Sequence, residues 1–523
     1  MSTKQAEETE FRELQQRLPE LWTEFHERPS ASHTCIIVPS LSFDQEELGK
    51  VAGVPFYEER LLFFLMRLRR PGARIMYVTS QPVDPDIVHY YLTLLTGVPA
   101  NHAERRLTML CLYDATPRAL TEKILERPRV VQRIRDWAGE RARAYLTCFN
   151  STPLERQLAV DLGIPLLGVD PDLSWIGTKS GGRSVFRDAG VPCASGRERL
   201  RTESEVVDAL DALTADRPGI RRAVVKLNAG FSGEGNALYT FPQDLPQQNG
   251  KRKAALASAL DDLKFAAEGH RKDAFLAKFS EMGGVVEEFL EAPEVESPSV
   301  QLRINPRREL TVVSTHDQVL GGDSGQVYLG CRFPASPDYR ADIIEKALRV
   351  GEVLVEQGAL GRFSVDFLAV RHPEQDWKCW AVEINLRMTG TTFPFVALQF
   401  LTGGSLDADG EFRSQRGVPK YYFATDTLSA PAYRGLLPQD FLEIVIHHGL
   451  HFRPSTETGV LFHMIGALSQ YGKIGVICVG DTPEEADELH RRTREVLDAE
   501  TSATSGGRGR LTSLFDDLPH AMD

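Results

Sequence analysis

The chain has 523 residues, of which 42% are hydrophobic and 25% are charged, a composition typical of globular proteins. Its length exceeds what one hydrophobic core supports and predicts several domains. The formal net charge of -13 argues against a protein that binds nucleic acid or anionic membranes, so an anionic ligand would need a local cluster of basic side chains.

The seven cysteines are scattered and form no C-x-x-C pair. This pattern argues against a disulfide framework or a zinc site and favours a reducing compartment. The first 27 residues are polar and acidic without a signal-peptide core, and no apolar run reaches the length of a membrane span. We therefore expect a cytoplasmic protein with no membrane partner and no nucleic-acid partner.

The N-terminal third predicts a helical extension at 1–30 and an α/β domain at 31–175. Apolar runs predict strands at 35–39 and 75–78, and apolar residues at helical spacing predict a helix at 57–70. Alternating strands and helices are typical of a doubly wound sheet, which is able to bind a nucleotide. No G-x-G-x-x-G follows the first strand, however, and this argues against a nicotinamide oxidoreductase.

A lysine and a glycine-rich loop follow one another in the next expected segment, 176–290. Lys226 interrupts an apolar strand, and the loop after it contains Gly230, Gly233 and Gly235. Glycines let backbone N–H groups approach phosphate oxygens closely, and lysine adds a positive charge. The spacing is not that of a P-loop, so a plain glycine-rich hairpin turn is an equal alternative.

An apolar strand then runs into acidic residues at 285–294. A connector of this kind is suited to hinge two lobes. We expect backbone groups of 288–290 to pair with an adenine edge, and Glu294 to accept hydrogen bonds from ribose hydroxyls.

Two strands of the expected lobe at 291–402 carry acidic side chains. Asp366 is a carboxylate in an otherwise apolar strand, which is costly unless it is paired or bound to metal. Glu383, Asn385 and Arg387 follow at a spacing of two, so they share one face of the next strand. Carboxylate and amide oxygens suit Mg²⁺, and a guanidinium suits phosphate or carboxylate oxygens. For the second strand alone, an edge strand with a solvated polar face is the alternative.

The C-terminal part predicts an α/β region at 403–500 and a flexible tail at 501–523. Four histidines of this region suggest a metal site: His447, His448, His451 and His463. No cysteine or paired acid accompanies them, so structural roles are favoured for all four.

In their joint order, these motifs resemble the ATP-grasp superfamily and, more narrowly, the pheganomycin-type peptide ligases. The resemblance covers about residues 35 to 498. It rests on Tyr57 through Gly177-Thr-Lys179-Ser, Val224-Val-Lys226-Leu-Asn-Ala-Gly230-Phe-Ser-Gly233-Glu-Gly235, Glu294-Val-Glu296-Ser-Pro-Ser299, Val382-Glu-Ile-Asn385-Leu-Arg387, and Phe462-His-Met through Gly472-Lys-Ile-Gly475. It implies an α/β protein with a doubly wound pre-ATP-grasp sheet, followed by a two-lobed α+β ATP-grasp fold and a C-terminal domain.

The resemblance also implies the residues of a site. The nucleotide would be bound by Lys179, Lys226, Gly230, Ser232, Gly233, Gly235, Glu287, Glu288, Phe289, Leu290 and Glu294. An ordinary exposed lysine is the alternative for Lys179. Mg²⁺, with Mn²⁺ as an expected substitute, would be held by Asp366, Glu383 and Asn385.

Arg387 would stabilise the transferring phosphoryl group or an acyl phosphate. Many members of the superfamily carry an arginine two residues before the metal aspartate, where this chain has Ser364. Arg303, Arg332 and Arg362 are therefore further candidates for that charge.

The activity implied is that of an ADP-forming carboxylate–amine ligase. A substrate carboxylate takes the γ-phosphate of ATP, and an amine then displaces phosphate from the acyl phosphate. The expected partners are small-molecule or peptide carboxylates and amines, and a homodimer is expected. A nucleotide-binding scaffold without ligase activity is the alternative, which the intact acidic residues disfavour. A carboxylase would require a carrier motif such as Met-Lys-Met, which the chain lacks.

Overall fold

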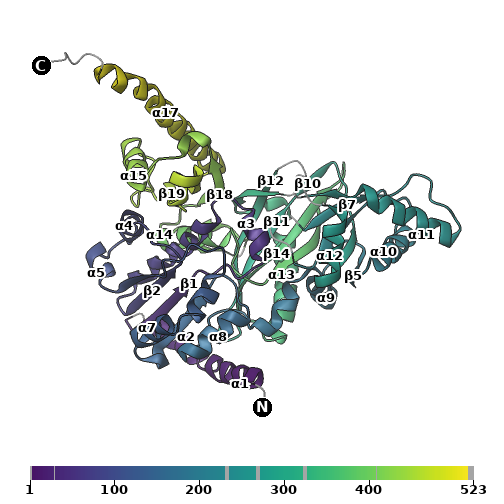
Figure 1. Cartoon of the computed structure of the whole chain (residues 1–523), viewed down its shortest axis with the longest axis horizontal. Helices are drawn as coiled ribbons and strands as arrows, with labels where there is room; N and C mark the ends of the chain where they lie inside the picture. Colours follow the sequence, from purple (N-terminus) through teal and green to yellow (C-terminus); the bar gives the residue numbers. More distant parts are fainter. Residues whose placement is uncertain are drawn as a thin grey trace, which may run out of the picture.

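The computed structural model describes residues 3–28, 30–229, 235–266, 271–321, 327–407 and 409–515, with the side chains of 3, 47 and 503–515 left out. Three sheets and their covering helices follow one another along the chain, with a small two-stranded sheet beside them (Figure 1). Among the described residues, no helix is both long and apolar enough to cross a membrane.

The N-terminal sheet is parallel, in the order β3-β2-β1-β4. Its strands are β1 His33–Val38, β2 Ala73–Thr79, β3 Leu107–Cys111 and β4 Ala144–Cys148. The helices of this part are α1 Thr3–Gln15, α2 Leu18–Glu27, α3 Gln45–Gly49, the 3₁₀ helix η1 Val54–Arg69, α4 Pro85–Thr93, α5 Ala100–Glu104, α6 Leu120–Leu125, α7 Pro128–Ala138, η2 Arg141–Arg143 and α8 Pro153–Leu162. Every residue of β1 is buried, as expected for a parallel sheet covered on both faces.

Two local features differ from the elements that the hydrophobic periodicity predicts. The N-terminal extension forms two helices, and Pro19 lies in the first turn of α2, where its missing N–H costs no hydrogen bond. The helix predicted at 57–70 is a 3₁₀ helix, η1. Residues 61–66 of η1 are all buried, because β2, α4 and α14 (Thr392–Thr402) pack around it.

The next sheet is antiparallel and five-stranded, in the order β5-β9-β6-β7-β8. Its strands are β5 Gly196–Leu200, β6 Arg222–Leu227, β7 Asn236–Thr240, β8 Lys264–Phe265 and β9 Gly284–Glu288. The accompanying helices are η3 Pro171–Gly177, α9 Lys179–Asp188, α10 Glu203–Asp216, α11 Asn249–Ser258, η4 Ala259–Asp262 and α12 Lys272–Met282.

The third sheet is large and antiparallel, in the order β10-β14-β11-β12-β13-β18-β20-β19, with β15 paired to β14. Its strands are β10 Glu294–Glu296, β11 Pro298–Ile304, β12 Leu310–Gly321, β13 Val327–Phe333, β14 Gly361–Arg371, β15 Lys378–Asn385, β18 Tyr421–Ser429, β19 Gly459–His463 and β20 Lys473–Gly480. A separate pair joins β16 Ser405–Leu406 to β17 Phe412–Arg413. The remaining helices are α13 Pro337–Glu356, η5 Pro431–Tyr433, α15 Pro438–His447, α16 Ala467–Tyr471 and α17 Pro483–Phe515.

The large sheet runs across the predicted boundary at 402/403. Strand β13 pairs with β18, with Cys331 opposite Ala424, so C-terminal strands continue the sheet that carries Asp366. The final helix, α17, continues to Phe515. No proline interrupts this segment.

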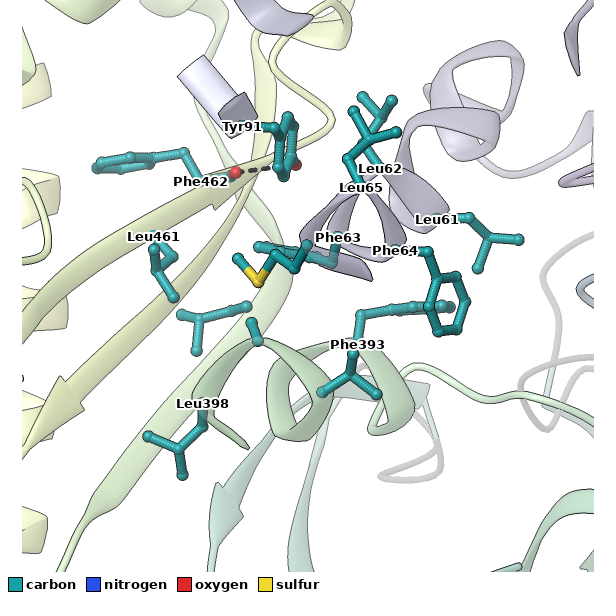
Figure 2. Packing of buried hydrophobic residues seen from close by; sticks show 14 of the residues in the cluster. Leu61, Leu62, Phe63, Phe64, Leu65, Tyr91, Phe393, Leu398, Leu461 and Phe462 are labelled. Atoms are coloured by element: carbon teal, nitrogen blue, oxygen red, sulfur yellow. Dashed lines mark hydrogen bonds between the residues drawn. The ribbon is translucent and has the colours of Figure 1, made fainter. Parts of the chain in front are cut away.

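The N-terminal and C-terminal parts share one apolar core, which Figure 2 shows from close by. The rings of Phe63 on η1 and Tyr91 on α4 pack edge to face, with centroids 5.1 Å apart. The Tyr91 hydroxyl donates to the carbonyl of Phe462 at 3.1 Å, and the Phe462 N–H donates to the Tyr90 hydroxyl at 3.0 Å. The ring contact packs η1 on α4, and the two hydrogen bonds hold α4 against β19 of the large sheet.

We expect Phe63→Ala to cost about 3–5 kcal/mol, because it removes a fully buried ring from this shared core. The loss should appear as a lower midpoint of urea unfolding followed by tryptophan fluorescence. Ile446→Ala on α15, where the side chain is 67% exposed, is the control and should change stability by less than about 0.5 kcal/mol. Equal shifts in both variants would contradict the assignment of Phe63 to the core.

Glu59 on η1 gives a pH-dependent prediction. Burial, with a smaller contribution from Asp84 and Glu58, raises the pKa of the Glu59 carboxyl to about 8. Its ordinary pKa is near 4.5, so the stability from the neutral form is present below that value and is lost as pH rises through 8. Glu59→Gln should therefore gain stability relative to wild type between pH 6 and pH 9, as thermal unfolding would show. A difference that stays constant over this range would refute the prediction.

Candidate functional site

A cavity of about 1500 Å³ lies between the five-stranded sheet and the large sheet. One wall consists of β6, β9 and the connector after β9, and the other consists of β11, β14 and β15. Its lining includes Lys226, Glu287, Glu288, Phe289, Leu290, Ser299, Asp366, Glu383, Asn385, Arg332 and Arg387. The fold thus brings most of the described candidate residues to one space.

Glu287 on β9 lies between two cations. Its Oε2 is 2.6 Å from Lys226 Nζ, and its Oε1 is 2.6 Å from an Nη of Arg183 on α9. Burial opposes ionisation of Glu287, but Lys226 and Arg183 outweigh it and lower the pKa of this carboxyl. Both carboxylate oxygens are engaged, so Glu287 positions Lys226 at the cavity wall in this structure. Arg183, which the sequence analysis did not select, completes the arrangement.

The connector begins where β9 ends. The Phe289 N–H donates to the carbonyl of Arg222 at 3.2 Å, and the Arg222 guanidinium lies 4.3 Å over the Phe289 ring. Glu288 pairs with Arg217 at 3.0 Å. The carboxylate of Glu294 faces Arg371 instead of the cavity, whereas Glu296 lines the cavity. Glu294 and Glu296 both belong to the motif at 294–299, and their spacing alone does not show which of them lines the cavity.

Asp366 and Glu383 lie directly opposite each other on β14 and β15. The Asp366 carboxylate accepts hydrogen bonds from Ser299 Oγ at 2.7 Å and from Asn385 Nδ2 at 2.9 Å. Burial, and then the charge of Glu383, raise the pKa of Asp366 to about 6. Burial also opposes ionisation of Glu383, but the pKa of Glu383 is lowered because Lys179 Nζ lies 2.6 Å from its Oε2.

These residues fit a divalent cation. They offer two carboxylates and an amide oxygen, and a cation would relieve the repulsion between the two half-buried carboxylates. In the described part of the chain, no group of three or more His, Cys, Asp or Glu side chains is placed to hold a metal ion. A site here therefore requires the amide oxygen of Asn385 or oxygens of the substrate beside the two carboxylates.

Lys179 opens α9, where Thr178 caps the helix by accepting from the N–H of Gly181 at 3.0 Å. Asn228, directly after β6, fixes the first turn of α9 through two hydrogen bonds. Its carbonyl accepts from the Lys179 N–H at 3.1 Å and its Oδ1 accepts from the Ser180 N–H at 3.0 Å. Lys179 and Lys226 both act electrostatically on Glu383. Of the predicted glycine loop, Gly235 is buried, while Gly230, Ser232 and Gly233 lie outside the described residues.

The candidate arginines occupy different places. Arg387 lines the cavity, and burial lowers the pKa of its guanidinium although Glu383 and Asp366 oppose this. Arg332 also lines the cavity, but it is half exposed and pairs with Asp487 on α17 at 3.3 Å.

Arg303 does not reach the described cavity lining. Arg303 lies on β11, opposite Arg362 of β14. Its guanidinium is 5.3 Å from the centre of the Trp22 ring. Ser299 lies at the cavity end of the same strand, and four residues of strand correspond to about 13 Å. Arg303 and Arg362 therefore face the N-terminal part of the molecule.

Comparisons with known proteins identify the family of the chain. Three family models match: a pre ATP-grasp domain at 71–164, an IQCH-like ATP-grasp at 173–264 and 269–409, and a PGM1 C-terminal domain at 440–493. L-propargylglycine--L-glutamate ligase of Streptantibioticus cattleyicolor is 33% identical over 471 residues, which cover 89% of this chain and 94% of that protein. The chain belongs to the ATP-grasp superfamily, with the pheganomycin-type peptide ligases.

More distant relatives share parts of this ATP-grasp organisation. IQ motif-containing protein H of Danio rerio is 24% identical over 434 residues, which cover 75% of this chain and 41% of that protein. A biotin carboxylase of Campylobacter jejuni superposes with a TM-score of 0.54 at 12% identity, covering 87% of this chain and 88% of that one. The latter likeness shows the fold alone.

The predicted fold class, a doubly wound α/β sheet followed by an ATP-grasp fold, is confirmed. This ATP-grasp protein is an ATP-dependent carboxylate–amine ligase, as predicted, and the inactive scaffold is not favoured.

Glu287→Gln tests whether Glu287 holds Lys226. It leaves two buried cations without their shared carboxylate, so we expect a loss of about 3–5 kcal/mol, measured by thermal unfolding. Glu288→Gln is the matched control on the neighbouring residue. Its surface pair with Arg217 should contribute less than about 1 kcal/mol. Similar losses in both variants would contradict the positioning role.

Proposed function

We propose that the cavity is the ligase active site, with ATP between the two lobes and the reacting carboxylate beside Arg387. The observation that carries this proposal is the shared cavity itself, which joins Lys226 and the connector after β9 to Asp366, Glu383 and Arg387. On this proposal, Lys179 and Lys226 bind the phosphates and residues 288–290 bind the adenine. In this structure Lys179 pairs with Glu383, Glu294 with Arg371 and Arg332 with Asp487, so each of the three takes its predicted role only by exchanging that partner.

Asp366, Glu383 and Asn385 would hold Mg²⁺, with Mn²⁺ accepted by the same oxygen donors. When bound, the cation would supply shielding of the triphosphate charge. Lys179 supports this set from outside by keeping Glu383 ionised. Asn385 and Ser299 orient the Asp366 carboxylate through hydrogen bonds.

The substrate carboxylate oxygen attacks the γ-phosphorus of ATP, the bond to the β-phosphate oxygen breaks, and ADP leaves. The amine nitrogen then attacks the acyl carbon, the bond to the phosphate oxygen breaks, and the amine proton passes to solvent. We propose that Arg387 stabilises the charge on the transferring phosphoryl group. Arg387 is half-buried in the cavity wall, where a fixed charge acts more strongly than it does in bulk water.

We propose that both substrates are amino acids or short peptides. The relative from Streptantibioticus cattleyicolor is named for L-propargylglycine and L-glutamate, and the similarity spans 89% of this chain, N-terminal and C-terminal elements included. We also propose that the protein acts in the cytoplasm, because all seven cysteines are free thiols. The homodimer stays a prediction, which light scattering after size exclusion would test.

The function is tested by release of ADP and phosphate from MgATP, and from MnATP in parallel. The substrate panel contains the L-amino acids, L-propargylglycine and short peptides. We expect product release that depends on a carboxylate and an amine together. Glu383→Gln should lower kcat by about 10²–10³-fold, because it removes a charge from the proposed cation site.

Glu345→Gln, at an exposed position on α13, is the control and should keep wild-type activity. AMP and pyrophosphate as products would overturn the acyl-phosphate route. Wild-type activity in Glu383→Gln would overturn the site.

A further inference from the structure

One end of the cavity is built from parts of the chain that the ATP chemistry leaves unused. Tyr57 and Arg60 come from η1 of the N-terminal part, Asp426 from β18 and Lys473 from β20, and all four line the cavity. Residues of η1, β18 and β20 all contribute to the shared apolar core, part of which Figure 2 shows.

The four side chains form one connected group. The Arg60 guanidinium lies 3.6 Å from the centre of the Tyr57 ring and forms an ion pair with Asp426. Lys473 Nζ donates to the Tyr57 hydroxyl at 3.2 Å and to the carbonyl of Ala52 at 3.0 Å. Arg60 and Lys473 are 6% and 7% exposed. Each cation is thus held in place before any ligand enters.

The group carries an excess of positive charge. Asp426 balances one of the two cations, Arg60 and Lys473. Glu59 does not balance the other, because its carboxylate accepts from the Gly466 N–H at 3.1 Å and burial raises its pKa to about 8. His463 is neutral, since burial, Arg60 and Lys473 lower its pKa to about 3. Buried charge without a counter-charge is costly, and an anionic ligand would compensate for it.

This cationic end is close to the reacting centre. The charge of Arg60 acts on Arg387, and the charges of Arg60 and Asp366 both act on the Tyr328 hydroxyl. Tyr328 also lines the cavity. Groups bound at Arg387 and groups bound at Arg60 and Lys473 therefore share one cavity.

We infer that Arg60 and Lys473 bind the unreacted carboxylate of the amine substrate, which is then an amino acid or peptide and not a simple amine. The inference rests on the proposed function, in which Arg387 and the acidic strand pair receive the carboxylate that is activated. We assign the anionic group at Arg60 and Lys473 to the other substrate. Its carboxylate bound at this end orients its amine toward the acyl phosphate.

The test compares the most active L-amino acid of the amine panel with its own α-carboxamide, which has nearly the same shape and lacks one charge. Wild type should prefer the acid by about 10- to 100-fold in kcat/KM. Lys473→Met should reduce this preference to less than about 3-fold, mainly through the KM for the acid, and Lys473→Arg should restore it. Arg60→Met combined with Asp426→Asn, which removes both members of the ion pair, should also reduce the preference.

Lys378→Met, at the exposed start of β15, is the control and should keep the full preference. Equal use of acid and amide by wild type, or an unchanged preference in folded Lys473→Met, would overturn the subsite. Hydroxylamine in place of the amine reports the first step alone, because it converts the acyl phosphate into a hydroxamate. If hydroxamate forms but the coupling reaction shows no preference for the acid over the amide, only the subsite is overturned. No hydroxamate and no ADP from any carboxylate overturns the proposed function and the subsite with it.

Discussion

The pairing of β14 with β15 sets the central constraint of this molecule, because it places two half-buried carboxylates directly opposite each other. Two like charges about 5 Å apart repel by about 3 kcal/mol at an effective dielectric constant near 20. Lys179, Ser299 and Asn385 reduce this cost by pairing with one carboxylate or hydrogen-bonding the other. The two carboxylates therefore stay close together and acidic, and the pair is suited to bind a cation that enters together with the substrate.

The second organising feature is the continuity of the large sheet. Because β13 pairs with β18, the C-terminal strands extend the same surface that carries Asp366 and Glu383. Helix η1 of the N-terminal part packs against those strands, so distant segments of the chain close one end of a single cavity. A ligase must hold two substrates and a nucleotide in register, and such positioning accounts for much of its catalysis.

The site was predictable where chemistry follows from local spacing. Glu383 and Asn385 are two residues apart on β15, Arg387 follows two residues after this strand ends, and all three line the cavity. Lys226 interrupts an apolar strand, which signals a special role for it. Local spacing could not predict whether Arg303 reaches the site, since this depends on how far along β11 the cavity extends. The pairings of Glu294 with Arg371 and of Glu287 with Arg183 join segments that are far apart in the sequence.

By itself, the sequence determined the order of the α/β and ATP-grasp parts and the acidic strand pair, because periodicity and residue chemistry act over a few neighbouring positions. The tertiary structure alone decided which cations meet which carboxylates, and that the C-terminal strands join the large sheet. It alone brought Arg60, Asp426 and Lys473 to one wall. Contacts of this kind depend on strand register and helix packing across hundreds of residues, and no local pattern records them.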